Sequence, residues 1–213
     1  MEPRQHWDDV YTKKAVDGVS WYRPHLERSL AFIEAAGLTH DAAILDVGGG
    51  ASTLVDDLVQ RGYRRVTVLD LAQSAIDAAK LRLGAAAANV IWRVDDIIRA
   101  DLAPSSVDLW HDRAVFHFLT DPADRARYVE QVARAVRPGG HVIVATFAPD
   151  GPERCSGLEV VRYDADRLHA AFGDRFVKVA SEAETHVTPW GSEQSFTYCY
   201  CRIAPAELAS APT

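Results

Sequence analysis

Short apolar runs alternate with segments of helical periodicity over the first 147 residues of the chain. Between the runs, apolar residues recur every three or four positions, as on the buried face of an amphipathic helix. Strands that alternate with helices are typical of a parallel sheet covered by helices. The runs that we interpret as buried strands span residues 43–47, 66–69, 90–94, 107–110 and 142–147.

Glycine and proline mark where the intervening helices begin and end. Gly37, Gly62 and Gly84 follow the last periodic residues of three helices, as C-terminal glycines do. Asp121-Pro122 is typical of a helix start, with a cap followed by a first-turn proline. Pro138-Gly139-Gly140 is expected to break that helix and to separate it from the strand at 142–147.

The pattern changes after residue 147. We expect a loop at about 148–159, a short helix near 164–172, and two strands at 176–183 and 195–203 that form an antiparallel hairpin. The sequence therefore predicts an α/β three-layer sandwich, with a seven-stranded, mostly parallel sheet that ends in the hairpin.

Composition and charge narrow the class of protein. The chain has 213 residues, 48% of them hydrophobic, which suits one domain with a full core. It has no apolar stretch of about 20 residues and no N-terminal secretory signal, so we expect no membrane association. A net charge of −7 disfavours nucleic acid as a partner. Three cysteines, an odd number, fit a reducing, cytoplasmic compartment.

Carboxylates follow the predicted strands one after another. They are expected to meet in a single crevice, because ligands of open α/β sheets bind beyond the carboxyl ends of the strands. A row of acids suits a cofactor with cationic and hydroxyl-rich parts, and it suits a polyphosphate poorly. The acids are Asp46, Asp70, Asp95, Asp96 and Asp112.

The glycine loop after the first strand has the spacing Gly48-x-Gly50-x-x-Thr53, which lacks the third glycine of a dinucleotide fingerprint. Residues 46–52 instead resemble the first motif, D-x-G-x-G-x-S, of the class I S-adenosylmethionine-dependent methyltransferases. Asp70 stands twenty residues past Gly50, as that resemblance requires. The resemblance covers roughly residues 43–147 and implies a Rossmann-like fold with S-adenosylmethionine as cofactor.

The resemblance also implies roles for individual residues. Asp46 would act on the methionine ammonium, Asp70 would accept both ribose hydroxyls, and Leu71 and Ile97 would enclose the adenine. Each acid could instead cap the helix that follows it. Together the expected cofactor-binding residues are Tyr11, Trp21, Asp46, Gly48, Gly49, Gly50, Ser52, Asp70, Leu71, Asp95, Asp96, Ile97 and Asp112.

On this reading residues 1–203 form a single methyltransferase domain. Residues 1–40 provide an N-terminal lid, rich in aromatic residues, and a helix; residues 41–147 form the cofactor-binding half, and residues 148–203 the acceptor side. The Ala/Pro-rich segment 204–213 is expected to be a flexible tail.

The acceptor site is expected after the fourth strand. Asp112-Arg113-Ala114 resembles the Asp-Arg-Gly/Ala stretch of thiopurine-type S-methyltransferases and the Asp-Lys-Gly stretch of a set of lysine methyltransferases. If this stretch were helical, Arg113 and His117 would share a face. His117 is then either a general base or a histidine packed between its neighbouring phenylalanines.

Residues 184–194, between the last two strands, are interpreted as a loop that carries His186 and Trp190 toward the acceptor. The predicted catalytic residues are Arg113, His117 and His186, and the predicted acceptor-binding residues are Tyr22, Arg113, His117 and Trp190. Cys199 and Cys201 share a strand face and could bind a soft metal together with Cys155. Simple burial is the default for such cysteines, and no metal is expected.

No unmistakable base stands in the sequence, which favours a soft nucleophile because a thiol needs little help to ionise. We therefore expect methyl transfer to a small acceptor such as a thiol or sulfide. A protein lysine N-methyltransferase is the alternative, followed by an NAD-dependent dehydrogenase and a non-catalytic cofactor-binding module. A monomer or weak homodimer is expected.

Overall fold

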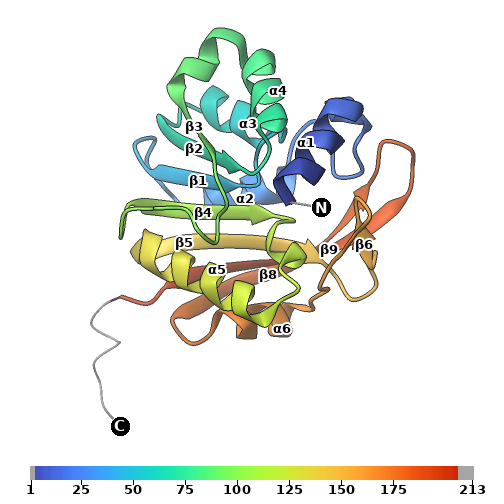
Figure 1. The fold of residues 1–213 in the computed structure, drawn as a ribbon. Helices are drawn as coiled ribbons and strands as arrows, with labels where there is room; N and C mark the ends of the chain where they lie inside the picture. Colours follow the sequence, from blue (N-terminus) through green and yellow to red (C-terminus); the bar gives the residue numbers. More distant parts are fainter. Residues whose placement is uncertain (1–2, 206–213) are drawn as a thin grey trace.

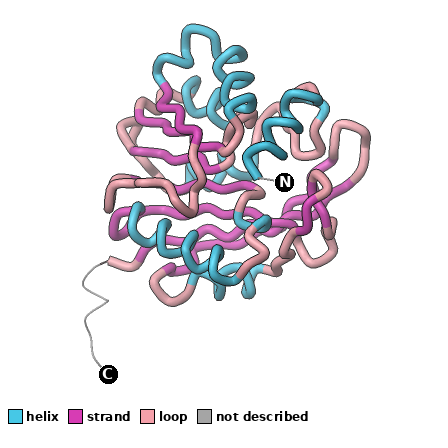
Figure 2. Tube along the Cα trace, in the orientation of Figure 1, coloured by secondary structure: helices cyan, strands magenta, loops and turns pink. Residues whose placement is uncertain are grey.

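The computed structural model describes residues 3–205 and contains a seven-stranded sheet in the order β3-β2-β1-β4-β5-β9-β8. The first five strands run parallel, whereas β9 is antiparallel to both β5 and β8. Figures 1 and 2 show the sheet running through the whole molecule. The strands are β1 (Ala43–Val47), β2 (Arg65–Asp70), β3 (Val90–Val94), β4 (Val107–Arg113), β5 (Val136–Phe147), β8 (Phe176–Val187) and β9 (Glu193–Ile203).

Helices cover both faces of this sheet and complete the predicted three layers. One core cluster joins the sheet to side chains of α5 and α6, and a second joins its other face to α2 and α3. Neighbouring residues of β1 point to different clusters, as strand geometry requires. The helices are α1 (Pro3–Lys13), α2 (Glu27–Ala35), α3 (Leu54–Gln60), α4 (Gln73–Leu83), α5 (Pro122–Ala135) and α6 (Ala165–Phe172), with 3-10 turns η1 (Val16–Gly18), η2 (Gly84–Asn89) and η3 (Phe116–Phe118).

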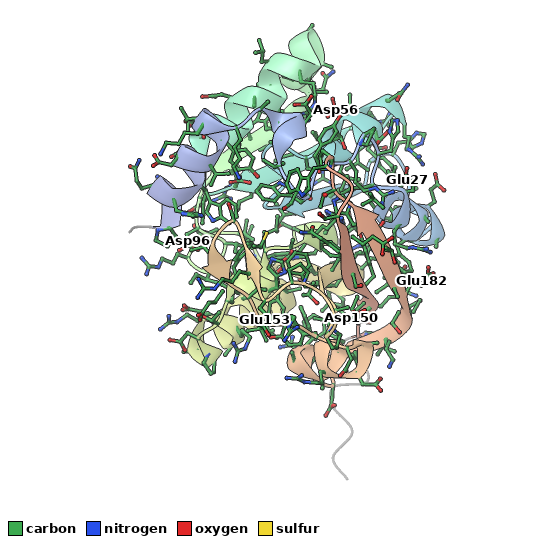
Figure 3. All side chains as sticks on the ribbon, turned by 90° about the vertical axis from the view of Figure 1, so that its right-hand side faces the viewer. Glu27, Asp56, Asp96, Asp150, Glu153 and Glu182 are labelled. Atoms are coloured by element: carbon green, nitrogen blue, oxygen red, sulfur yellow. The ribbon has the colours of Figure 1, made fainter. Side chains whose placement is uncertain are left out.

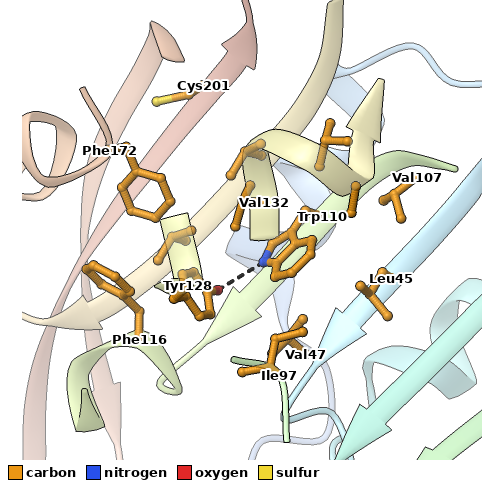
Figure 4. Packing of buried hydrophobic residues seen from close by; sticks show 14 of the residues in the cluster. Leu45, Val47, Ile97, Val107, Trp110, Phe116, Tyr128, Val132, Phe172 and Cys201 are labelled. Atoms are coloured by element: carbon orange, nitrogen blue, oxygen red, sulfur yellow. Dashed lines mark hydrogen bonds between the residues drawn. The ribbon is translucent and has the colours of Figure 1, made fainter. Parts of the chain in front are cut away.

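Two buried aromatic side chains fix α5 against β4. Trp110 and Tyr128 are both fully buried, and their rings meet edge to face at a centroid distance of 5.6 Å. The Trp110 Nε1–H donates to the Tyr128 hydroxyl at 2.9 Å, as Figure 4 shows. Aromatic pairs with their polar atoms satisfied contribute strongly to core packing. Asp121 caps the start of α5 through the backbone N–H of Ala123, as the sequence predicts.

Strands β4 and β5 differ from their predicted extents. The strand β4 continues to Arg113, because it pairs with β1 up to Asp112 and with β5 up to Arg113. Arg113 therefore ends a strand, and the expectation that it shares a helical face with His117 in η3 is wrong. The strand β5 begins at Val136, so Pro138-Gly139-Gly140 lies inside it and shifts the β4–β5 register rather than forming a separate loop.

The last hairpin is also longer than predicted. Cross-strand pairing of β8 and β9 continues through Glu184 and His186 to Val187, so only residues 188–192 form the connection. The interpretation of residues 184–187 and 193–194 as loop is therefore wrong. Within the predicted loop at 148–159, two short strands, β6 (Arg154–Cys155) and β7 (Leu158–Glu159), form a second small sheet.

Among residues 3–205, no helix is long and apolar enough to cross a membrane. The predicted flexible tail falls mainly on residues 206–213, which lie outside the described part of the chain.

Candidate active site

A cavity of about 620 Å³ lies at the carboxyl ends of the parallel strands. That size falls in the range of about 300–1,000 Å³ typical of small-molecule sites. A smaller cavity of about 40 Å³ adjoins it and shares five lining residues with it. The larger cavity includes the predicted residues Tyr11, Trp21, Gly48, Asp70, Leu71, Asp95, Asp96, Ile97 and Arg113, and the smaller adds Asp46, Gly49, Ser52 and Tyr22.

The glycine loop packs directly against the two carboxylates that the sequence singled out. A Cβ on Gly49 would collide with Asp46 Oδ2. A Cβ on Gly50 would lie 2.6 Å from both Asp70 Oδ2 and the Ala75 Cβ, which is closer than real Cβ atoms come. Gly48 has a φ of +67°, a conformation that favours glycine. The loop is therefore built so that backbone, not side chains, lies beside the carboxylates.

Asp70 ends β2 and is held by two backbone N–H groups. Gly50 N–H donates to Oδ2 at 3.0 Å and Ala72 N–H donates to Oδ1 at 2.8 Å. Burial raises the pKa of Asp70 to about 6, and the neighbouring carboxylates Asp46 and Asp8 add to that rise. Each carboxylate oxygen can accept a second hydrogen bond, so the pair can receive the two hydroxyls of a ribose.

Asp46, the second-last residue of β1, has one carboxylate oxygen paired and the other free. His111 Nδ1–H donates to Oδ1 at 2.7 Å, whereas Oδ2 is buried without a hydrogen-bond partner beside the smaller cavity. A buried carboxylate oxygen without a partner is costly, and a ligand ammonium placed there would satisfy it. The residues present therefore fit the cationic end of a methionine.

The segment after β3 carries the residues that are expected to contact the adenine. Both oxygens of Asp95 are occupied, one by the Asp96 N–H and the other by Arg93. Asp96 Oδ1 accepts from Ile98 N–H at 3.2 Å, while Oδ2 has only the distant Arg99 Nε at 3.7 Å. Asp96 is therefore the better placed carboxylate for an exocyclic amine, with Leu71 and Ile97 as the apolar lining.

Aromatic side chains of the N-terminal segment lie over the cavity. The Trp7 ring is 5.1 Å from Phe118 and 5.9 Å from Trp21, and Tyr11 lies 6.1 Å from Trp21. All four line the larger cavity. The helix α1 that carries Trp7 and Tyr11 stands beside α4 in Figure 1. These side chains therefore line the cavity from the N-terminal segment, together with Phe118, which was not among the predicted site residues.

The far wall of the cavity is apolar, and its strands β5 and β9 are separated from Asp70 on β2 by β1 and β4. It is formed by residues from η3, from β5, from the β6–β7 hairpin and from β9, four segments distant in sequence. Its main side chains are Phe118, Phe147, Cys155, Leu158 and Phe196. Burial raises the pKa of Cys155 to about 12, so its thiol is neutral at physiological pH.

Arg113 lies where the two cavities meet. Its guanidinium is 4.3 Å from the Phe196 ring centroid and 3.5 Å from Glu184 Oε2. Arg23 donates to the other oxygen of Glu184 at 2.8 Å and lines the smaller cavity. Two guanidinium groups thus share one carboxylate, which leaves positive charge beside the expected methionine site. Sequence reasoning missed Arg23 and Glu184, because their contact joins residues that are 161 positions apart in the chain.

Several predicted site residues do not reach either cavity. His117 is fully buried, its Nδ1 accepts from Phe147 N–H at 3.4 Å, and burial together with Arg113 lowers its pKa to about 3. His186 is also buried, and its Nε2–H donates to the Ser20 carbonyl at 2.5 Å. Trp190 is 60% exposed in the turn between β8 and β9. His117 and His186 are thus packed in the core and do not line either cavity, although the His117 ring packs against the cavity-lining Phe118 and Phe147.

Asp112, which was predicted to bind the cofactor, does not line either cavity. Its two oxygens accept from the backbone N–H groups of Val115 and Phe116, which follow the strand, and from the Tyr128 hydroxyl. Burial raises its pKa to about 6 despite these bonds. The carboxylate therefore anchors the turn after β4 to α5.

The three cysteines do not converge. Cys199 and Cys201 share a face of β9, with their sulfur atoms 3.3 Å apart, and pack in the core cluster of α5 and α6. Cys155 belongs to the cluster on the other face of the sheet. The alternative of a three-thiol metal site is therefore wrong. Within residues 3–205, no group of three or more His, Cys, Asp or Glu side chains is placed to hold a metal ion.

Comparisons with known proteins agree with this geometry. A family model described as a methyltransferase domain matches residues 44–140. A curated relative, the EEF1A lysine methyltransferase 2 of Danio rerio, is 24% identical over 157 residues, which cover 67% of each chain. A ubiquinone biosynthesis O-methyltransferase of Alkalilimnicola ehrlichii is 34% identical over 104 residues, 49% of this chain and 41% of that protein. The chain therefore spans about two thirds of the first relative and under half of the second.

Solved structures share the fold over nearly the whole chain. One, from a study of the conversion of a disulfide bond into a thioacetal group during echinomycin biosynthesis, has a TM-score of 0.76 at 18% identity and covers 97% of this chain and 95% of its own. Another is the Burkholderia thailandensis 1,6-didemethyltoxoflavin-N1-methyltransferase with bound S-adenosylhomocysteine. It has a TM-score of 0.66 at 20% identity and covers 94% of this chain and 84% of its own.

The sheet order, the glycine loop and the two strand-end carboxylates define a Rossmann-like enzyme that binds a nucleoside cofactor. With the methyltransferase domain and the named relatives, the protein is a class I S-adenosylmethionine-dependent methyltransferase.

Residues of this chain would contribute to methyl transfer in two ways: they would orient the cofactor and exclude water. When bound, the cofactor would supply a methyl carbon on a sulfonium, from which the acceptor would displace the neutral thioether, S-adenosylhomocysteine, in line. Asp46, Asp70 and Asp96 would hold the ammonium, ribose and adenine of the cofactor. The aromatic side chains of the N-terminal segment would keep water away. Such alignment in a dry site accounts for much of the rate of group transfer between bound reactants.

Proposed function

We propose that the enzyme methylates a small, soft nucleophile, such as a thiol or sulfide, bound against the apolar far wall of the larger cavity. The observation that carries the proposal is the chemistry of that wall. Phenylalanine rings from three separate segments form it, and Arg113 beside them is already paired with Glu184. The two histidines predicted as catalytic residues, His117 and His186, are buried and do not line the cavity.

A soft nucleophile is favoured because the acceptor must lose a proton without an obvious base. A thiol with a pKa near 8.5 is partly ionised at neutral pH, whereas an amine with a pKa near 10.4 is almost wholly protonated. The odd number of cysteines and the net charge of −7 support a cytoplasmic enzyme whose acceptor is not nucleic acid, and we propose a monomer or weak homodimer.

A protein lysine side chain is the second candidate acceptor, and acidic residues around the cavity favour it. Figure 3 looks onto the side of the molecule that carries α1 and the β6–β7 hairpin, with Asp96, Asp150 and Glu153 on view. These carboxylates would attract a cationic peptide. The lysine methyltransferase relatives support the same candidate. The acidic residues that line the cavity itself are Asp70, Asp95, Asp96, Asp121, Asp124 and Glu159.

The decisive experiment measures release of S-adenosylhomocysteine with a panel of acceptors: sulfide, small thiols, phenols, small amines and a lysine-bearing protein extract. Turnover with sulfur acceptors supports the proposal. Turnover with amines or protein extract but with no thiol would overturn it, and protein extract alone would establish the lysine alternative.

A pair of variants tests whether the apolar wall holds the acceptor. Leu158→Trp should fill the acceptor end of the cavity and lower turnover about tenfold or more, because overpacked side chains displace their neighbours. S-adenosylhomocysteine affinity should change less than about twofold, because Leu158 is not among the residues expected to bind the cofactor. Leu81→Trp, at a position that is 86% exposed, is the matched control and should leave turnover unchanged. Equal effects of both variants would refute the assignment of this wall.

A further inference from the structure

Three buried polar side chains form a continuous hydrogen-bonded chain that starts at the smaller cavity. His111 Nδ1 is 2.7 Å from Asp46 Oδ1, and His111 Nε2 is 2.8 Å from Ser29 Oγ. None of the three side chains is more than 2% exposed. Asp46 and His111 face each other as direct partners in the register of β1 and β4, and both line the smaller cavity.

The donors and acceptors in this hydrogen-bonded network follow from the chemistry of its groups. A carboxylate can only accept hydrogen bonds, so His111 Nδ1 carries a hydrogen and donates a hydrogen bond to Asp46. The Ser29 hydroxyl, from α2, bonds to the other ring nitrogen, so both ring nitrogens are fixed. The ring can therefore hold the Asp46 carboxylate in one orientation, in which Oδ1 is occupied and Oδ2 remains the unpartnered oxygen.

We propose that His111 is a positioning residue for cofactor binding. By holding Asp46 Oδ1, it directs the free Oδ2 at the site of the methionine ammonium, and Ser29 fixes the imidazole that does so. A purely structural polar pair would have no reason to leave a buried carboxylate oxygen unpaired beside a cavity.

The same chain of contacts reaches the acceptor side. Ser29 Oγ is 3.4 Å from the Tyr198 hydroxyl, which lies 3.3 Å from Glu184 Oε2. Arg113 Nε–H donates to that hydroxyl at 3.1 Å. The group that orients Asp46 and the Arg113 guanidinium at the junction of the two cavities thus belong to one buried network.

The test compares two ligands by calorimetric titration in the absence of any acceptor. S-adenosylhomocysteine carries the amino-acid end that Asp46 would bind, whereas 5′-methylthioadenosine lacks it. His111→Phe keeps a planar ring and removes both hydrogen bonds. It should weaken S-adenosylhomocysteine binding about tenfold to hundredfold, as the loss of bonds to a charged group does. Binding of 5′-methylthioadenosine should change less than about twofold.

Two further variants keep the test decisive if His111→Phe fails to fold. His111→Asn retains a donor near the Nδ1 position and should recover much of the lost affinity. Ser29→Ala should weaken S-adenosylhomocysteine binding by a smaller factor and again spare 5′-methylthioadenosine. Equal losses for the two ligands, or no loss for either, would overturn the proposal. Because no acceptor is used, this outcome is independent of which nucleophile the enzyme methylates.

Discussion

Asp70 shows how the surroundings of one residue set the conditions for cofactor binding. Two backbone N–H groups favour its charged form, but complete burial dominates and raises its pKa to about 6. The ionised carboxylate can accept from both ribose hydroxyls, whereas the protonated form can accept fewer hydrogen bonds. Cofactor binding should therefore favour the deprotonated protein.

We expect affinity for S-adenosylhomocysteine to fall as pH drops through about 6. With a pKa of about 6 in the unliganded protein, the dissociation constant at pH 5 should be about tenfold higher than at pH 7.5. Titration calorimetry across this range measures it. Asp70→Asn should bind weakly at every pH and lose most of the dependence, which separates Asp70 from Asp112, whose pKa is also about 6. Unchanged wild-type affinity down to pH 5 would contradict the assignment.

At the scale of elements, one hydroxyl joins β4, the turn after it and α5. The Tyr128 hydroxyl accepts from Trp110 Nε1–H at 2.9 Å and donates to Asp112, which in turn accepts from the backbone N–H groups of Val115 and Phe116. All three side chains are fully buried. The end of β4, and with it Arg113, is therefore positioned through α5.

Tyr128→Phe should lower the free energy of unfolding by about 2–3 kcal/mol, because it leaves a buried indole N–H and a buried carboxylate oxygen without this partner. Chemical denaturation measures the change. Tyr163→Phe is the matched control: its ring packs 5.7 Å from Phe116 in the same core cluster, and its expected cost is below about 1 kcal/mol. If both substitutions cost the same, the Tyr128 hydroxyl does not have the role described.

At the scale of the whole molecule, the Asp8 carboxylate links the N-terminal helix α1 to α4 of the cofactor-binding half. The N-cap residue of α4 is Ala72, which offers no capping side chain. Asp8 of α1 takes that place, accepting from the Ser74 backbone N–H at 3.0 Å and from its hydroxyl at 2.8 Å. The Asp8 carboxylate therefore both caps α4 and holds α1 beside the cavity.

Asp8→Ala should release α1 and weaken S-adenosylhomocysteine binding about tenfold, with a loss of unfolding free energy of about 0.5–2 kcal/mol, as for other caps. Calorimetric titration and chemical denaturation measure the two effects. Asp8→Asn keeps an acceptor of the same size and should stay close to wild type, because asparagine also caps helices well. Full affinity in Asp8→Ala would show that α1 is not part of the binding site.

Local sequence determined most of the elements and the cofactor half of the site. Residues 43–47 and 90–94 form the predicted strands, and the helix start at Asp121-Pro122 is confirmed, because period, caps and glycine stops act over a few residues. The class of enzyme and its cofactor followed from a contiguous motif at 46–52. The positions of Asp46 and Asp70 at the cavities follow from strand ends, which the sequence marks directly.

Only the tertiary structure decided the polar network and the apolar wall. His111 directly follows the predicted strand 107–110, and its partners Asp46 and Ser29 are 65 and 82 residues away in sequence. Phe147, Cys155 and Phe196 meet because β9 pairs with β5 and a small hairpin packs beside them. His117 and His186 were predicted at the acceptor but lie in the core. Whether a side chain faces a cavity or a core depends on long-range strand pairing, and the local pattern of polar and apolar residues does not specify that pairing.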